Sequence, residues 1–156
     1  MSDPNSGIPL PVADDGGGLY WDALQAGRLT YQRCECGHAW LPAREHCPRC
    51  LSSIWLRETA SGGGRLISWV TYHRAYHPAF KDRLPYTVAI VELDEGPRLI
   101  SNLTSDTDRA ALSIDMPLWL AIEQEGDIAL PRFTTAAPRD GSPGREPQPE
   151  RMEGSS

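Results

Sequence analysis

The chain has 156 residues, of which 40% are hydrophobic and 23% charged, and this composition is typical of a globular protein with room for one ordinary domain or two small ones. It contains no apolar run long enough to cross a bilayer, and its first residues lack the basic and apolar segments of a secretory signal, so we expect a cytoplasmic protein. The formal charge of −6 and the sequence pI of about 5.1 disfavour a binder of nucleic-acid phosphates, because such proteins carry a basic surface.

Residues 1–18 and 138–156 are rich in glycine, proline and polar side chains and contain few large apolar ones. Such segments bury too little surface to offset the entropy of ordering, so we expect a disordered leader and a disordered tail. Between them we expect two modules. Residues 19–60 would form a helix and a cysteine-rich segment, and residues 61–137 would form a β-rich domain.

The residues from Leu19 to Ala26 predict a short helix that ends at Gly27. Leu19, Ala23 and Leu24 would share one side of it. A helix of about two turns is marginal by itself, so it must pack on the rest of the chain or on a partner.

All four cysteines lie in one seventeen-residue stretch, as Cys34-Glu35-Cys36 and Cys47-Pro48-Arg49-Cys50. The second pair has the two-residue gap of a zinc knuckle. In the first pair, positions i and i+2 of a strand point to the same side, so both thiols can face one ion. In a reducing compartment this pattern predicts Zn²⁺ bound by four thiolates and not two disulfides. An ion with four sulfur ligands has no open position for water, so the zinc would be structural.

Two alternatives remain open for this segment. His38 and His46 lie in the same loop, and imidazole is an equally good zinc ligand, so either could replace Cys34. The four thiols could also remain without a metal.

Ser61-Gly62-Gly63-Gly64 predicts a linker, after which strand patterns begin. Strands are expected over residues 65–76, 86–93, 98–103, 117–123 and 128–133, with residues 106–114 bridging the third and the fourth. Alternation in the first strand would place Leu66, Ser68, Val70 and Tyr72 on one face and Ile67, Trp69 and Thr71 on the other. Five strands with a long third connection predict a mainly β fold with a Greek-key barrel of the OB type, and an SH3-like barrel is the nearest competitor.

Two other groups of residues suggest chemistry. His73 and His77 could act as an acid and a base, but no nucleophile elbow, phosphate loop or paired carboxylate motif accompanies them, so we expect loop and surface groups. Trp69, Tyr72 and Tyr76 could stack bases, which gives the alternative function of a single-stranded nucleic-acid-binding protein. The acidic balance and the single lysine, Lys81, argue against that alternative.

Charge is unevenly distributed along the chain. Residues 28–57 carry five arginines and two glutamates, a net charge of +3, whereas residues 65–137 carry seven basic and ten acidic groups, a net charge of −3. The cysteine-rich segment is therefore suited to an anionic ligand or to an acidic partner surface, although ordinary solvated arginines would give the same count.

Several separated motifs occur in an order that resembles one known family. They are LYWDALQAGRL, QRCECGHAWLPAREHCPRC, SGGGRLISW, PYTVAIVELDEGPRLISNL and ALPRF, and they span about residues 19–134. The chain resembles the zinc-ribbon plus OB-fold family of acyl-CoA-associated accessory proteins. It departs from that family where Cys34-Glu35-Cys36 replaces C-x-x-C, and where Asp115 stands in place of a glycine before the fourth strand.

The resemblance implies a short N-terminal helix, a rubredoxin-like zinc ribbon and a five-stranded OB-fold barrel. It also implies a non-catalytic subunit of a thiolase-fold enzyme such as a lipid-transfer-protein-type aldolase, a thiolase or an acyltransferase, and sometimes of an enoyl-CoA hydratase-like protein. Such complexes act on CoA thioesters, including steroid side-chain or polyketide-like acyl groups. We therefore expect a hetero-oligomer that binds no membrane. Contacts with the partner or with CoA are expected at Trp21, Arg33, Arg44, Arg49, Tyr76 and His77, where the arginines suit bidentate contacts with phosphates or carboxylates.

Overall fold

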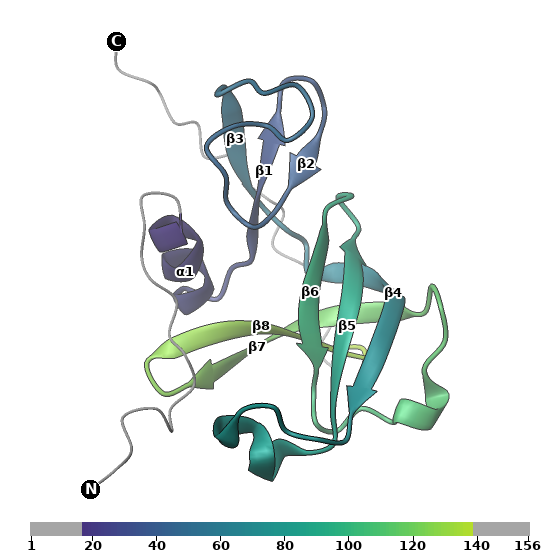
Figure 1. Cartoon of the computed structure of the whole chain (residues 1–156). Coiled ribbons are helices and arrows are strands. Elements are labelled where there is room, and N and C mark those ends of the chain that lie inside the picture. The colour runs from purple at the N-terminus through teal and green to yellow at the C-terminus, as the bar shows by residue number, and fades with distance from the viewer. Residues whose placement is uncertain (1–16, 139–156) are drawn as a thin grey trace, which may run out of the picture.

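The structure is a computed structural model that describes residues 17–138 (Figure 1). The predicted leader and tail lie outside the described residues, apart from Pro138 and from Gly17 and Gly18, which begin helix α1 (Gly17–Gln25). The predicted helix is thus present, but it begins two residues earlier and ends one residue earlier. Within the described residues, no helix has the length and apolar character needed to span a bilayer.

Helix α1 packs on the body of its own chain. Leu24 is fully buried in the main hydrophobic core, and Tyr20 and Trp21 pack against that core. Leu19 is 53% exposed, so the prediction that it shares the buried side was wrong. Tyr20, Ala23 and Leu24 follow the i, i+3, i+4 spacing of one helix face, and Leu19 falls outside it.

The cysteine-rich segment forms a small three-stranded antiparallel sheet. Its strands are β1 (Thr30–Cys34), β2 (Ala39–Trp40) and β3 (Trp55–Thr59), in the order β2-β1-β3. The first cysteine pair lies at the β1–β2 turn, and the second pair lies in the longer β2–β3 connection. Figure 1 shows this ribbon above the barrel, joined to it by the chain that leaves β3.

The second part is a closed five-stranded barrel. Its strands are β4 (Gly63–Tyr72), β5 (Tyr86–Leu93), β6 (Arg98–Leu103), β7 (Pro117–Glu125) and β8 (Ile128–Thr134), in the order β4-β5-β6-β8-β7. All neighbours are antiparallel except β6 and β8, which pair in parallel at Leu103 and Phe133. The fold is therefore the predicted mainly β architecture, with an OB-like barrel.

Two short 3₁₀ helices interrupt the connections of the barrel. The first, η1 (Pro78–Arg83), follows β4, which ends at Tyr72 and not at the predicted Tyr76. The second, η2 (Arg109–Ala111), lies in the predicted bridging segment. The barrel interior is filled by fully buried apolar side chains from four strands, namely Leu66, Val91, Leu93, Leu118 and Phe133.

The glycine run does not form a free linker. Gly63 and Gly64 belong to β4, where Gly64 pairs with Leu93 on one side and with Leu118 on the other. A Cβ atom at Gly64 would lie 2.8 Å from the carbonyl oxygen of Glu92. Glycine is needed here because the backbones of β4 and β5 approach closely, and this contact over long sequence distance leaves no local signal.

A β-bulge in β4 changes which side chains face the core. Leu66 pairs with Val91, and the next pair is Ser68 with Ile90, so Ile67 is the extra residue. Beyond the bulge, Trp69 packs against the core and Val70 faces solvent. The predicted faces were therefore wrong after residue 66, because one inserted residue reverses the alternation of a strand.

Candidate metal centre and docking surface

The four cysteines converge at one point of the ribbon. The Sγ atoms of Cys34 and Cys50 lie 3.5 Å apart, those of Cys36 and Cys47 lie 3.8 Å apart, and all four lie within 4.8 Å of one another. Thiolates in a tetrahedral zinc site with Zn–S bonds of about 2.3 Å are separated by about 3.8 Å. The donor set and its spacing therefore fit one structural Zn²⁺, held by Cys34, Cys36, Cys47 and Cys50 without an open position.

Two polar side chains hold the loop that leads to the second cysteine pair. The buried side chain of Gln32 donates to the carbonyl oxygen of Arg44 (2.9 Å) and accepts from the backbone amide of Arg44 (2.7 Å). The indole of Trp55 donates to the carbonyl oxygen of Glu45 (2.9 Å). These bonds fix the loop to β1 and β3, so its sulfur ligands are positioned in advance of metal binding.

The short first pair closes through a tight turn. The amide of Gly37 donates to the carbonyl of Cys34 (2.9 Å), the amide of Cys34 donates to the carbonyl of His38 (2.9 Å), and Gly37 adopts a φ of 90°. The ring of His38 stacks on Trp40, with centroids 5.9 Å apart, and neither His38 nor His46 belongs to the group of converging ligands. The turn thus brings Cys36 to the site despite the one-residue gap.

Packing the thiols together divides their proton affinities. Burial raises the pKa of Cys47, but backbone hydrogen bonds from Cys50 and Arg49 and bonds with neighbouring thiols outweigh it and lower this pKa to about 7. A backbone hydrogen bond from Cys36 lowers the pKa of Cys34, but burial and the neighbouring thiols raise it to about 12. Four thiolates at this spacing repel one another, and a divalent cation is what makes all four stable together.

The ribbon has little hydrophobic core of its own. Its separate cluster contains Cys34, Trp40 and Cys47, with Trp55 packed against them. Two of these buried residues are themselves ligands, so the metal supplies cross-links that a larger apolar core supplies elsewhere.

The predicted contact residues separate into two groups. Arg44 and Arg49 are exposed on the loop of the second cysteine pair. Arg33 lies nearby, but its guanidinium is engaged within the chain, with an ion pair to Glu58 (3.1 Å). Trp21 is half-buried and packs edge-on against Tyr20 at 5.2 Å.

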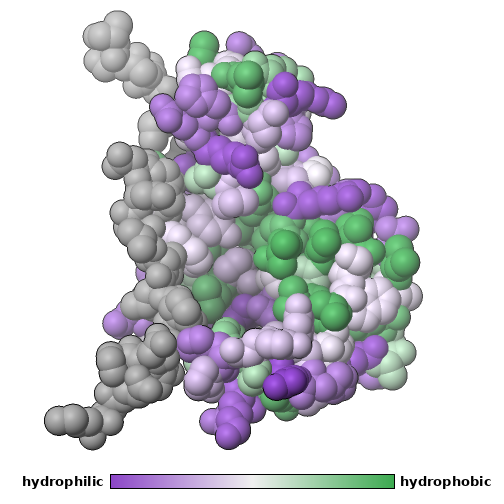
Figure 2. All heavy atoms as spheres, in the orientation of Figure 1, coloured by the Kyte–Doolittle hydropathy of each residue, from purple (hydrophilic) through white to green (hydrophobic). Residues whose placement is uncertain are grey.

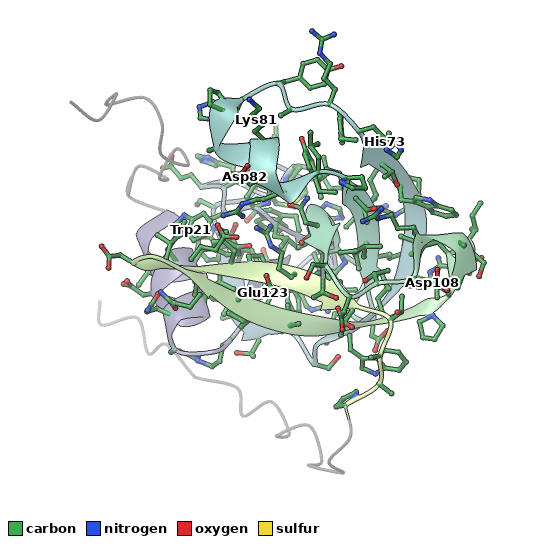
Figure 3. The ribbon with its side chains drawn as sticks, turned by 90° about the horizontal axis from the view of Figure 1, so that it is seen from below. Trp21, His73, Lys81, Asp82, Asp108 and Glu123 are labelled. Atoms are coloured by element: carbon green, nitrogen blue, oxygen red, sulfur yellow. The ribbon has the colours of Figure 1, made fainter. Side chains whose placement is uncertain are left out.

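Tyr76 and His77 lie at the other end of the molecule, in the segment between β4 and β5. The imidazole Nδ1 of His77 accepts a hydrogen bond from the amide of Ala79 (3.2 Å) and so caps η1. Figure 3 places Lys81 on η1 and His73 at the end of β4, around the same loop. The structure therefore does not bring the ribbon arginines and the Tyr76 loop into one site (Figure 1).

An exposed apolar surface on the barrel was missed by the sequence analysis. We name it the outer sheet face. Figure 2 shows hydrophobic residues gathered over β4, β5 and β6, below a band of hydrophilic ones. Register pairs Val70 with Val88 and Ile90 with Ile100, and the side chains of Val70 and Ile100 are 48% and 74% exposed. The outer sheet face consists of Val70, Val88, Ile90 and Ile100.

Charged residues border one end of the outer sheet face. Glu92 accepts from Arg65 and from Arg98 through its two carboxylate oxygens, each at 2.7 Å, and Arg65 also reaches Asp115 at 2.7 Å. The hydrogen bond from Arg65, followed by that from Arg98, lowers the pKa of Glu92. The group stays ionised near neutrality and forms a polar rim.

Asp115 itself has a φ of 66°, a conformation that favours glycine. Aspartate is among the side chains that tolerate it best, so the departure from the family pattern is accommodated.

Comparison with protein-family models gives two consecutive matches. The model described as "ChsH2, rubredoxin-like zinc ribbon domain" matches residues 21–55. The model described as "ChsH2, C-terminal OB-fold domain" matches residues 57–123.

Curated relatives carry two kinds of name. A "Probable enoyl-CoA hydratase alpha subunit" from Thermomonospora curvata is 35% identical over 89% of this chain but only 43% of its own length. "DUF35 domain-containing scaffold protein" is the name of relatives from Methanothermobacter thermautotrophicus and Pyrococcus furiosus. They are 35% and 39% identical and are covered over 80% and 68% of their lengths. This chain thus spans less than half of the hydratase subunit.

Solved structures share the architecture. A chain of the "Ltp2-ChsH2(DUF35) aldolase" superposes with a TM-score of 0.70 and 34% identity, covering 80% of this chain and 98% of that one. A DUF35-family protein of unknown function from Sulfolobus solfataricus has a TM-score of 0.51 at 14% identity and supports the fold alone. The zinc ribbon, the OB-fold barrel and these relatives together identify the chain as a member of the ChsH2 (DUF35) zinc-ribbon and OB-fold family.

Proposed function

We propose that this chain is a non-catalytic accessory subunit that binds and supports a thiolase-fold enzyme acting on CoA thioesters. A lipid-transfer-protein-type aldolase, a thiolase or an acyltransferase would be such an enzyme. The observation that carries the proposal is the match to a chain of the Ltp2-ChsH2(DUF35) aldolase, because 98% of that chain is covered. The unit in this role would be the ribbon of residues 19–60 with the barrel of residues 61–137.

The coverage of the relatives favours a scaffold over a hydratase. The hydratase names belong to proteins of which this chain covers 43% and 36%, so most of each such protein has no counterpart here. The scaffold proteins are covered over 80% and 68% of their lengths. Their name therefore describes proteins of nearly the same extent.

The chemistry of the described residues agrees with a supporting role. The cysteine cluster leaves a bound ion no open position. The carboxylate of Glu92 is held between two arginines, and so is that of Glu125, which is an arrangement for holding loops and not for transferring protons. Between residues 17 and 138, no nucleophile is hydrogen-bonded to a histidine base.

The outer sheet face is where the partner enzyme would bind. An apolar centre bordered by charged groups is the arrangement found in protein–protein interfaces. Val70 and Ile100 supply the apolar centre, and Arg65, Glu92 and Arg98 supply the charged border. The occupant we propose is the acyl-CoA-processing enzyme itself, with a face of matching apolar character.

Co-purification tests the proposal. The tagged full chain should retain a thiolase-fold enzyme from its own cells, identified by mass spectrometry, and should turn over no CoA thioester alone. Ile100→Asp places a charge in the outer sheet face at a side chain that is 74% exposed, so the fold should survive. We expect the partner affinity to fall at least about tenfold, or about 1.4 kcal/mol.

Ile114→Asp is the matched control, because Ile114 is also largely exposed but lies in the β6–β7 connection. It should retain the partner. Purification of the chain without any acyl-CoA enzyme, or turnover by the isolated chain, would contradict the proposed function.

A further inference from the structure

The segment between β4 and β5 encloses an open hollow of about 500 Å³. Side chains that carry charge, hydrogen-bond donors or an aromatic ring line it, namely His73, Arg74, Tyr76, His77 and Lys81. The metal centre uses none of these groups. In OB-fold proteins the loop between the first two strands is part of the ligand-binding surface, together with the face of strands two and three.

An aromatic cluster holds this segment in shape. Tyr72 stacks on Tyr86 with centroids 5.2 Å apart, and Tyr76 stands edge-on to Tyr72 at 6.2 Å. Phe80 contacts Tyr86 at 5.6 Å and His77 at 6.1 Å. The hollow is therefore formed by packed residues, and Tyr76 remains 78% exposed on top of them.

The cations of the hollow have no internal partner. Arg83, on the same segment, forms an ion pair with Glu125 (2.6 Å). Arg74 and Lys81 are exposed, and neither forms a salt bridge with any residue in the range 17–138. Two unpaired cations facing one hollow in a chain of net charge −6 are suited to an anionic ligand.

His77 adds a hydrogen-bond donor. Its Nδ1 accepts from the amide of Ala79, so this nitrogen carries no proton and Nε2 carries it. The Nε2–H group is then available to an oxygen acceptor in the hollow.

We propose that the hollow binds the phosphorylated adenosine end of a CoA thioester. Arg74, Lys81 and the Nε2–H of His77 would contact the phosphates, and the exposed ring of Tyr76 would stack on the adenine. This inference depends on the proposed function, which supplies the CoA thioester. The apolar outer sheet face begins beside Tyr72 and Tyr86, so the hollow lies next to the surface assigned to the partner enzyme.

Calorimetric titration of the full chain tests this site with four ligands: CoA, adenosine 3′,5′-bisphosphate, pantetheine and a single-stranded oligonucleotide. We expect CoA and the bisphosphate to bind and pantetheine, which lacks the nucleotide, to fail. Arg74→Ala, Lys81→Ala and Tyr76→Ala should each weaken the binding of the bisphosphate at least about fivefold. Arg28→Ala removes an exposed arginine outside the hollow and should leave that binding unchanged.

Three outcomes would overturn the site. They are equal binding of CoA and pantetheine, an equal loss in Arg28→Ala and Arg74→Ala, and tighter binding of the oligonucleotide than of CoA. Partner co-purification with the same variants separates this site from the proposed function. A chain that retains the partner but binds no nucleotide contradicts the hollow alone, whereas a chain that retains no acyl-CoA enzyme contradicts the function.

Discussion

Arg83 and Glu125 lie 42 residues apart and form a 2.6 Å ion pair that ties η1 to the end of β7. Arg132 reaches the same carboxylate oxygen at 3.2 Å. The hydrogen bond from Arg83 is the main cause that lowers the pKa of Glu125 below its ordinary value of 4.5, against the opposing effect of burial. The position of the loop around the hollow therefore depends on an ionised carboxylate.

This pair predicts a loss of stability in acid. Because the folded state holds Glu125 below its unfolded pKa, the pair stabilises the fold above that value, and the stabilisation disappears as pH falls through the folded pKa. Glu125→Gln should lower the free energy of unfolding near neutrality by about 1–3 kcal/mol and reduce the decline between about pH 5 and pH 3. Urea unfolding at several pH values measures both effects.

Glu123→Gln is the control for that experiment. The Glu123 carboxylate lies 3.9 Å from Arg132 and is 46% exposed, so its removal should change stability little. Equal pH dependence in the two variants would show that the Arg83–Glu125 pair does not stabilise the fold.

Cys47→Ser should remove the zinc. Cys47 is fully buried at the centre of the four thiols, and serine is a poor substitute for a thiolate ligand. Metal analysis should find one zinc ion per chain before the substitution and none after it. Hydrogen exchange should rise across β1 to β3 while β5 and β6 keep their protection, because the barrel has a separate core.

The exposed Ser53→Ala is the control, and it should retain the metal. Zinc retained in full by Cys47→Ser would exclude this residue from the ligand set.

Leu51→Asn should raise stability and weaken partner binding at the same time. Leu51 is 74% exposed and has a φ of 63°, a strained conformation for leucine that asparagine adopts more readily. We expect the free energy of unfolding to rise by about 0.5–1 kcal/mol. Loss of an exposed apolar side chain should lower the affinity for the partner enzyme in co-purification. A variant that binds the partner as well as the original chain would place Leu51 outside the interface.

Gly64→Ala should destabilise the barrel. The new methyl group would lie 2.8 Å from the carbonyl oxygen of Glu92, and that backbone atom cannot move without disturbing the β4–β5 pairing. The expected cost is about 1–3 kcal/mol in thermal or urea unfolding. Gly18→Ala has open space around its Cβ and lies in α1, so it should be neutral or stabilise by up to about 1 kcal/mol.

Local patterns were sufficient to predict the cysteine cluster and the order of the strands. The gaps in Cys34-Glu35-Cys36 and Cys47-Pro48-Arg49-Cys50 carry the ligand pattern, and strands 86–93 and 98–103 are recognisable from β-branched residues around the Asp94-Glu95-Gly96-Pro97 turn. Here the chemistry of neighbouring residues determines the structure, so the sequence is informative.

The features that were missed depend on contacts between distant segments. The bulge at Ile67 arises from the pairing of β4 with β5, and it turned Val70 outward, so the outer sheet face was not predicted. Ile100 alternates with buried Leu99 and Ser101, and its position beside Arg98 and Asn102 was the available signal of an exposed side chain. The ion pairing that occupies Arg33 likewise depends on the register of β1 with β3.

The parallel pairing of β6 with β8 gives every barrel strand a neighbour on both sides, whereas the ribbon sheet ends at β2 and β3. Among the described strands, those two are therefore the edges at which an incoming strand could add by main-chain pairing. The barrel must recognise other molecules chiefly by its side chains. Substitutions on its surface should thus be able to alter partner choice while the backbone stays the same.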